Sequence, residues 1–181
     1  MIQLHLHPTL ATATSILAGF CKSPPQTADP VLQHYLRYLQ HAKDYALINS
    51  PANKDGLEVE SDSDWAGCKL TRKSTSGIVI LLLGCVILFA SRTQETIALS
   101  SGEAELYGIG STVAEGLFVC NFVKEVGLAM KTTLTVGTDS TAGKSLASRF
   151  GTSRKSRHID TRLLYMQELV ERGLLRLKKN P

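Results

Sequence analysis

Residues 58 to 67 read E-V-E-S-D-S-D-W-A-G and combine the spacing of a β-strand with a run of negative charge. Side chains alternate between the two faces of a strand, so Glu58, Glu60, Asp62 and Asp64 share one face. Four like charges cannot all be desolvated cheaply. This face of the strand is therefore either open to water or placed against a cation.

The composition around this strand is that of a soluble globular protein. The chain has 181 residues, of which 43% are hydrophobic and 20% charged, enough for one domain with a real core and an additional helical piece. The formal net charge is only +4, but it is unevenly distributed, since residues 149–158 hold four Lys or Arg, one His and no acid. A local basic patch of this kind favours a polyanionic partner.

Cysteine spacing and hydropathy argue against a zinc protein, a secreted protein and a membrane-spanning protein. The four cysteines show no paired spacing of the kind that a zinc site needs, so we expect reduced thiols in an intracellular protein. The N-terminus lacks the charged start and apolar centre of a secretory signal. The apolar run 78–90 is too short for the roughly 20 residues of a membrane helix. Gly84 in its centre predicts a tight hairpin of two buried strands instead.

The first fifty residues show apolar side chains at helical spacing. Asp29 followed by Pro30 predicts the start of a helix, with an N-cap acceptor and a proline at the first helical position. A polar break follows at residues 49–56. We expect a helical segment over residues 1–56 and a second domain over residues 57–181.

The second domain begins with a different pattern. Three strands are predicted, over residues 57–64, 78–83 and 85–91. Their short connections indicate an antiparallel meander. Ser100 with Glu103 three residues later matches a capping box, and it opens a long helix that ends near Gly127. Glycines are unfavourable inside a helix, so Gly108, Gly110 and Gly116 indicate places where this helix lies close against the sheet.

The remaining elements complete an α/β fold. A strand around Leu134 and Val136 is followed by a short helix that opens at residues 138–140, then by the basic loop. A further helix ends at Gly173, and a last strand begins just after it. We expect a mixed sheet, with three antiparallel strands and then a parallel strand, helices packed on it and a helical segment before it.

Three acids lie on three of these elements, namely Asp62, Glu105 and Asp139. A fourth strand that returns parallel to the first through a crossover helix would place the ends of both strands side by side. Three carboxylates without imidazole or thiolate suit Mg²⁺ or Mn²⁺, and such sites often hold two ions roughly 3.5 to 4 Å apart. Taken singly, each acid is more typical of a solvated surface.

Several sequence runs also carry a resemblance. They are S-D-S-D-W-A-G-C, T-R-K-S-T-S-G, S-R-T-Q-E-T-I-A-L-S-S-G-E-A-E-L-Y, T-D-S and S-R-H-I-D-T-R. In order and spacing they resemble the ribonuclease H domain of copia-type LTR retrotransposon polyproteins, over about residues 57 to 179. The run L-R-Y-L-Q-H-A-K-D-Y-A-L resembles the end of the preceding reverse transcriptase region. The polymerase active site is absent, so no polymerase activity is expected.

The resemblance implies a ribonuclease H-like fold and a metal-dependent endonuclease that hydrolyses the RNA strand of RNA:DNA hybrids. It implies that Asp62, Glu105 and Asp139 are catalytic and hold two Mg²⁺ or Mn²⁺ ions. It also implies a fourth metal-binding Asp in a helix after the last strand, so we expect a domain truncated at its C-terminus. Asp160 is a weaker candidate for that ligand, because its place at a helix start resembles that of a structural or substrate-side residue.

Two main interpretations of function therefore stay open, an active nuclease and a catalytically inactive retrotransposon remnant that keeps the fold and binds nucleic acid. A membrane-associated protein that uses residues 78–90 is a third, weaker alternative. The basic loop is either an ordinary solvated loop or a phosphate-binding segment, with Arg154, Lys155 and Arg157 as contacts. His158 either assists product release, as in some relatives, or makes a hydrogen bond within the loop. Expected partners are an RNA:DNA hybrid and the reverse transcriptase portion of the same polyprotein, with no membrane, in a cytoplasmic virus-like particle or the nucleus.

Three further expectations concern side chains near the acids. Trp65 is predicted to pack under the end of the first strand. Glu103 is expected to cap its helix rather than bind metal. The other strand acids, Glu58, Glu60 and Asp64, are expected to be solvated or balanced by the T-R-K turn.

Overall fold

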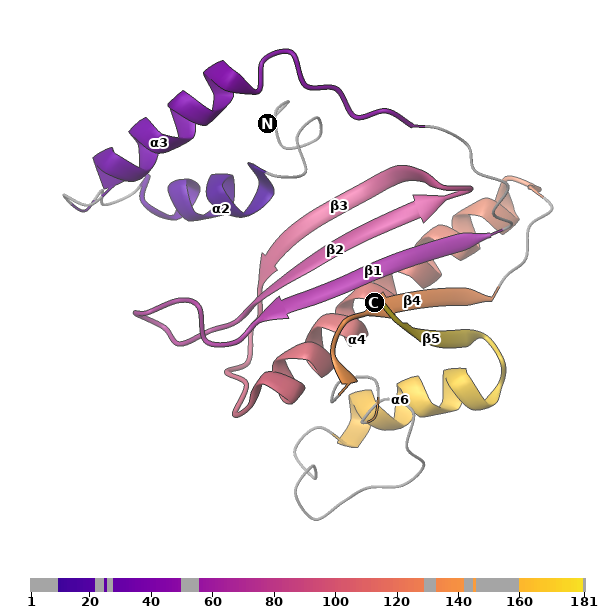
Figure 1. The fold of residues 1–181 in the computed structure, drawn as a ribbon. Helices are drawn as coiled ribbons and strands as arrows, with labels where there is room; N and C mark the ends of the chain where they lie inside the picture. The colour runs from indigo at the N-terminus through magenta and orange to yellow at the C-terminus, as the bar shows by residue number, and fades with distance from the viewer. Residues whose placement is uncertain are drawn as a thin grey trace.

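The computed structural model describes residues 10–21, 28–49, 56–128, 133–141 and 160–180, together with positions 25 and 145. Its elements in chain order are α2 (Ala11–Gly19), α3 (Ala28–His41), β1 (Leu57–Asp64), β2 (Thr75–Leu82), β3 (Cys85–Thr93), α4 (Ser101–Glu125), β4 (Leu134–Thr138), α6 (Asp160–Glu171) and β5 (Leu175–Lys179) (Figure 1). The short helix expected after residues 138–140 falls largely outside the described residues.

The five strands form one mixed sheet in the order β3-β2-β1-β4-β5. Strands β1, β2 and β3 pair antiparallel, whereas β4 pairs parallel with β1 and β5 parallel with β4. The predicted sheet is confirmed. Strand β2 begins three residues earlier than expected, because Thr75 and Ser76 pair with both neighbouring strands although they are polar.

Residues 78–90 form the hairpin that their composition predicts. Leu82 pairs with Cys85, and the two residues between them, Leu83 and Gly84, have positive φ angles of 53° and 85°. Two positive φ angles are typical of the tight type I′ turn, and glycine adopts one of them without steric cost. Within the described ranges, α4 is the one helix long and apolar enough to cross a membrane, but more than half of that stretch is buried inside the protein.

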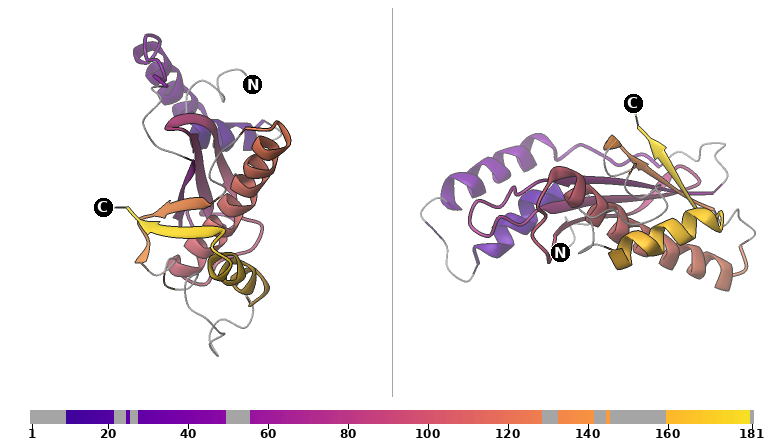
Figure 2. Two further views of the ribbon diagram at one scale, coloured as in Figure 1. Left: turned by 90° about the vertical axis from the view of Figure 1, so that its right-hand side faces the viewer. Right: turned by 90° about the horizontal axis from the view of Figure 1, so that it is seen from below.

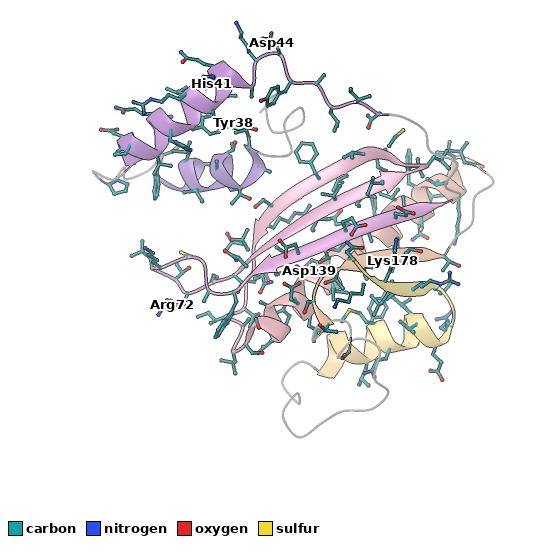
Figure 3. All side chains as sticks on the ribbon, viewed as in Figure 1. Tyr38, His41, Asp44, Arg72, Asp139 and Lys178 are labelled. Atoms are coloured by element: carbon teal, nitrogen blue, oxygen red, sulfur yellow. The ribbon has the colours of Figure 1, made fainter. Side chains whose placement is uncertain are left out.

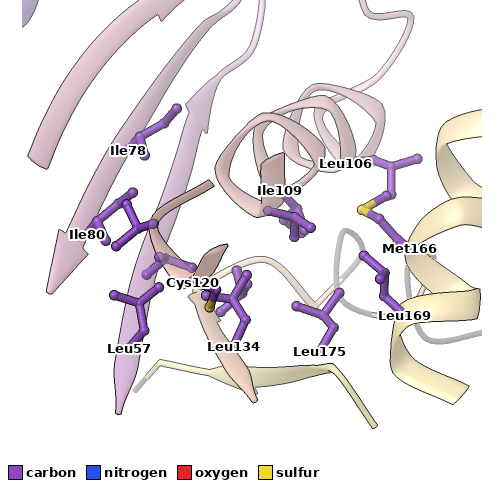
Figure 4. Close-up of a cluster of buried hydrophobic side chains, with 14 of the residues drawn as sticks. Leu57, Ile78, Ile80, Leu106, Ile109, Cys120, Leu134, Met166, Leu169 and Leu175 are labelled. Carbon is purple, nitrogen blue, oxygen red and sulfur yellow. The ribbon is translucent and has the colours of Figure 1, made fainter. Parts of the chain in front are cut away.

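The hydrophobic core lies between one face of the sheet and the helices α4 and α6. Figure 4 shows side chains from the strands, from α4 and from α6 meeting in one cluster. Its fully buried members include Val59, Ile78, Ile80, Leu106, Ile109, Val113, Leu134, Val136 and Met166. Burying each large side chain contributes roughly 1.5–3 kcal/mol, so this cluster holds α4 firmly on the sheet.

Two glycines of α4 let the helix approach the strands closely. A Cβ atom at Gly116 would lie 2.8 Å from Leu134 Cδ1, and one at Gly108 would lie 2.3 Å from Ser63 Oγ. Both distances are too short for a real contact, so the predicted close packing is confirmed at these positions. Gly110 differs, because the nearest atom to a Cβ there would be Met166 Sδ at 4.0 Å.

The start of α4 is fixed by the predicted capping box. Ser100 Oγ accepts a hydrogen bond from the Glu103 N–H (3.2 Å). The return bond runs from the Leu99 N–H to Glu103 Oε2 (2.9 Å), one residue earlier than in the standard motif. Tyr107 donates its hydroxyl to Glu103 Oε1 (2.8 Å). The cap therefore holds the first turns of α4, where Glu105 lies.

The helices α2 and α3 lie on the β3 side of the sheet, and α6 lies on the β5 side (Figures 1 and 2). Thr12 and Ser91 join α2 to β3 through their hydroxyls (3.0 Å), and Thr14 joins α2 to Tyr35 of α3 (3.1 Å). Helix α3 begins one residue before the predicted cap Asp29. This aspartate then lies in the first turn, where a negative charge interacts favourably with the helix dipole.

Candidate metal centre

Three predicted acids meet where β1 and β4 stop pairing. The last pair between these strands is Glu60 with Gly137, and Asp62 and Asp139 each lie two residues further on. Glu105 reaches the same place from α4, and one carboxylate oxygen of each of the three acids lies within 4.8 Å of the others. Figure 3 labels Asp139 at this end of β4, beside β1. The expected convergence of the carboxylates is therefore present.

The three carboxylates differ in their surroundings. Asp62 and Asp139 are exposed, whereas Glu105 is only 7% exposed. Glu105 Oε1 accepts a hydrogen bond from the Ser63 N–H (3.2 Å). Glu105 Oε2 is buried and has no hydrogen-bond partner among the residues that the structure describes. An unpaired buried carboxylate oxygen is costly, so the charged form of Glu105 would be stabilised by a positive partner.

The electrostatics of the site also favour a bound cation. Burial, and then the negative charge of Asp62, raise the pKa of Glu105 to about 7. The hydrogen bond from Ser63 opposes this shift, and the charge of Asp139 adds to it. A divalent cation would offset both effects on the pKa, because it would pair with the buried oxygen and neutralise the crowded charge. The oxygen-only ligand set suits Mg²⁺ or Mn²⁺.

A cavity of about 360 Å³ lies beside the acids on the face of the sheet opposite α4. Asp62, Asp139 and Glu60 line it together with Asn180 and with Thr12 of α2. Glu60 was expected to be solvated or balanced by the T-R-K turn. Instead it is half-buried, and its carboxylate accepts a hydrogen bond from the Asn180 side-chain amide. The Asn180 N–H also donates to Thr138 O (2.9 Å), so this residue joins the ends of β1 and β4.

Two other side chains near the end of β1 are now placed. The prediction that Trp65 packs under the sheet is wrong, since its side chain is 54% exposed and its indole N–H donates to Ala98 O (3.1 Å). Strand β1 ends at Asp64, so the sheet no longer directs the next side chain inward. Asp64 is exposed and accepts a hydrogen bond from the Thr75 N–H.

A buried polar group beneath the acids was not predicted from the sequence. Gln94 donates from Nε2 to Ser76 Oγ (2.9 Å) and to Ala104 O (2.8 Å), and its Nε2 lies 3.4 Å from Ser63 Oγ. A signal for it exists in the sequence. Ser61 and Ser63 occupy inward positions of β1, opposite a helix glycine, where apolar residues would be usual.

The chain resembles several known proteins, although no family model matches it. It is 37% identical over 112 residues to the secreted RxLR effector protein 161 of Plasmopara viticola, covering 62% of this chain and 79% of that protein. It is 26% identical over 170 residues to the retrovirus-related Pol polyprotein from transposon RE1 of Arabidopsis thaliana, and 28% identical over 172 residues to that from transposon TNT 1-94 of Nicotiana tabacum. These alignments cover 94% and 95% of the chain, which spans 12% and 13% of the two polyproteins.

The chain is thus similar in sequence to retrotransposon Pol polyproteins, and its fold is that of a ribonuclease H domain.

Solved structures agree with this ribonuclease H fold. The domain matches LC11-RNase H1, isolated from compost, with a TM-score of 0.50 and 14% identity over 71% of this chain and 86% of that one. It matches the foamy viral protease-reverse transcriptase dRH, solved in complex with double-stranded DNA, with a TM-score of 0.59 and 14% identity. That match covers 99% of this chain and 30% of the viral one.

The other predicted site residues of this ribonuclease H domain are not placed. Arg154, Lys155, Arg157 and His158 lie outside the described residues. Asp160 begins α6, but its side chain is not described. Their roles stay predictions.

Proposed function

We propose that this ribonuclease H domain is a metal-dependent endonuclease that hydrolyses the RNA strand of RNA:DNA hybrids as part of a retrotransposon polyprotein. The observation that carries the proposal is the group formed by Asp62, Glu105 and Asp139. Their carboxylate oxygens lie within 4.8 Å of one another, and one buried oxygen has no hydrogen-bond partner among the described residues. The resemblance in sequence and fold to ribonuclease H domains supports the same activity.

In this mechanism, Asp62, Glu105 and Asp139 would hold two Mg²⁺ or Mn²⁺ ions. Bound divalent ions supply activation of a water molecule and stabilisation of the oxygen that leaves the phosphodiester. The two aspartates are exposed, so a substrate phosphate can approach them from the solvent. Glu105 is held from beneath by the Ser63 N–H, and because its pKa is raised, a proton would compete with a cation for this carboxylate.

The proposed substrate needs two further kinds of contact. An RNA strand is distinguished from DNA by its 2′-hydroxyl groups, which are accessible in the wide minor groove. Contacts to phosphates position a duplex without reading its sequence, and Arg154, Lys155 and Arg157 are the proposed donors. The reverse transcriptase portion of the polyprotein is the proposed protein partner, which would deliver the hybrid.

A cleavage assay tests this function directly. A hybrid with labelled RNA is incubated with the full chain in Mg²⁺, in Mn²⁺ or in EDTA, beside a DNA duplex of the same sequence. We expect metal-dependent cleavage of the hybrid RNA alone, and its loss in Asp62→Asn and Asp139→Asn. Glu125→Gln, an exposed change at the far end of α4, is the matched control and should cleave as the parent does.

Equal cleavage by Asp62→Asn and the parent would reject the site, and cleavage in EDTA would reject the metal. A third outcome would support the other interpretation. If the chain binds the hybrid with an affinity that falls steeply with salt, but no metal produces cleavage, it is an inactive remnant that binds nucleic acid.

A further inference from the structure

A buried side chain connects two of the three backbone segments that carry the acids. Gln94 follows β3 and is 8% exposed. Its Nε2 donates to Ala104 O (2.8 Å), the carbonyl of the residue before Glu105. The same nitrogen lies 3.4 Å from the hydroxyl of Ser63, the residue after Asp62. The amide therefore touches the immediate neighbours of two candidate metal ligands.

The position of Gln94 is itself fixed by the sheet. Its backbone N–H donates to Ser74 O (2.8 Å), and its Nε2 donates to Ser76 Oγ of β2 (2.9 Å). Ser76 Oγ is in turn 3.3 Å from Ser63 Oγ. Because Gly108 lacks a side chain, α4 can lie directly against Ser63. The glutamine, the strands and the first turns of α4 are thus held in one arrangement.

This network of hydrogen bonds also contacts a candidate metal ligand, Glu105. The Ser63 N–H donates to Glu105 Oε1 (3.2 Å), so a shift of α4 relative to β1 would move the Glu105 carboxylate away from Asp62. The glutamine also carries a cost. Gln94 Oε1 is buried and lacks a hydrogen-bond partner in the described part of the chain, which offsets part of the stability that its Nε2 hydrogen bonds contribute.

We infer that Gln94 is a positioning residue that sets the separation of Glu105 from Asp62 by holding Ala104 and Ser63 together. It touches neither substrate nor metal. The inference rests on the proposed function, because it concerns the affinity of the carboxylate group for divalent cations. Residues that orient metal ligands typically change metal affinity by about 10- to 100-fold when they are replaced.

The test compares two buried glutamines. Gln94→Met keeps the length of the side chain but removes its donors, while Gln167→Met makes the same change on α6, where the glutamine is 4% exposed. Mn²⁺ binding to the full folded chain is measured by titration of the free-ion paramagnetic resonance signal. Cleavage of the hybrid is measured against Mg²⁺ concentration. We expect Gln94→Met to weaken Mn²⁺ binding and raise the required Mg²⁺ by about tenfold or more, and Gln167→Met to leave both unchanged.

A merely structural role for Gln94 would lower the melting temperature without changing the Mn²⁺ affinity of the folded protein, and that result would overturn the inference. Should Gln94→Met fail to fold, Ser76→Ala removes one acceptor of the same amide and should weaken Mn²⁺ binding by a smaller factor. Unchanged Mn²⁺ affinity in Ser76→Ala would then count against the inference.

If the parent chain binds Mn²⁺ and cleaves hybrid, and Gln94→Met has the same Mn²⁺ affinity and cleavage, only the inference fails. If the parent chain binds no Mn²⁺, the proposed function fails and the inference fails with it.

Discussion

The contact between α4 and the sheet is apolar at one end and polar at the other. Near Gly116 the helix meets Leu134 of β4, in a region of fully buried apolar side chains. Near Gly108, two turns earlier, the same helix meets the hydroxyls of Ser61 and Ser63 on β1. A glycine allows close approach at both ends, yet one contact is apolar and the other is polar.

The apolar end of this contact therefore serves stability, whereas the polar end serves the proposed function. Apolar burial at the first end stabilises the fold. At the second end, Ser61 Oγ, Gln94 Oε1 and Glu105 Oε2 are buried and lack partners among the described residues, which costs stability. We conclude that the apolar end offsets the cost of the polar end, where the candidate metal ligands lie.

The largest expected effect is at the apolar end. Leu134 is fully buried, so Leu134→Ala should lower the free energy of unfolding by about 2–5 kcal/mol, through lost burial and the cavity left behind. Urea denaturation measures the change. The folded fraction should keep its Mn²⁺ affinity, and a loss of that affinity would show that the two ends are not separate.

The next effect has the opposite sign. Without metal and above pH 7, Glu105→Gln should be more stable than the parent, because it removes a charge that is buried and crowded by Asp62. A pKa of about 7, against 4.5 for the free group, sets an upper limit of roughly 3 kcal/mol, at about 1.4 kcal/mol per pKa unit. Urea denaturation in EDTA at pH 8 measures it.

The pH dependence of this difference follows from the sign of the shift. Well below pH 4.5 Glu105 is protonated in both the folded and the unfolded state, and it contributes no penalty. As the pH rises towards 7, the unfolded chain releases this proton before the folded chain does, so the parent loses stability relative to Glu105→Gln. Saturating Mg²⁺ at pH 8 should make the parent more stable than Glu105→Gln, because only the parent gains binding energy. An equal response of both proteins to Mg²⁺ would contradict the metal centre.

A pair of glycine variants sharpens the comparison. Gly116→Ala and Gly108→Ala should each cost about 1–3 kcal/mol, since their Cβ atoms would lie 2.8 Å from Leu134 and 2.3 Å from Ser63, respectively. Only Gly108→Ala should also weaken Mn²⁺ binding, because it displaces the residue whose N–H holds Glu105. Equal Mn²⁺ affinities in the two variants would mean that the polar end does not position the ligand.

The smallest expected effect lies just before the polar end. Ser100→Ala removes the side-chain acceptor for the Glu103 N–H and should cost about 1 kcal/mol. Thermal unfolding of the variant measures this loss. Ser101→Ala changes the adjacent, exposed serine and serves as the control, so a similar loss there would argue against a specific cap.

The fold was predictable because its signals are local. Strand alternation, the glycine in the hairpin and the capping box each depend on residues close together in the chain, and each is confirmed. The convergence of the three acids was also predicted, because strand order places the ends of β1 and β4 together. Their role as metal ligands stays a prediction.

The polar network was missed because its contacts are distant in sequence. Gln94 lies 31 residues from Ser63 and 10 from Ala104, so no short motif joins them. The placement of Trp65 was wrong for a related reason. Its exposure depends on where β1 ends relative to the segment before α4, and hydropathy alone does not specify that relation.

The alternation of β1 has one more consequence, for folding itself. Because neighbouring side chains point to opposite faces, a slip of β1 by one residue would bury Glu58, Glu60 and Asp62 and expose Leu57 and Val59. Such a mispaired sheet would place several carboxylates in its interior. The acids on this face of β1, Asp62 among them, therefore disfavour the wrong strand alignment during folding.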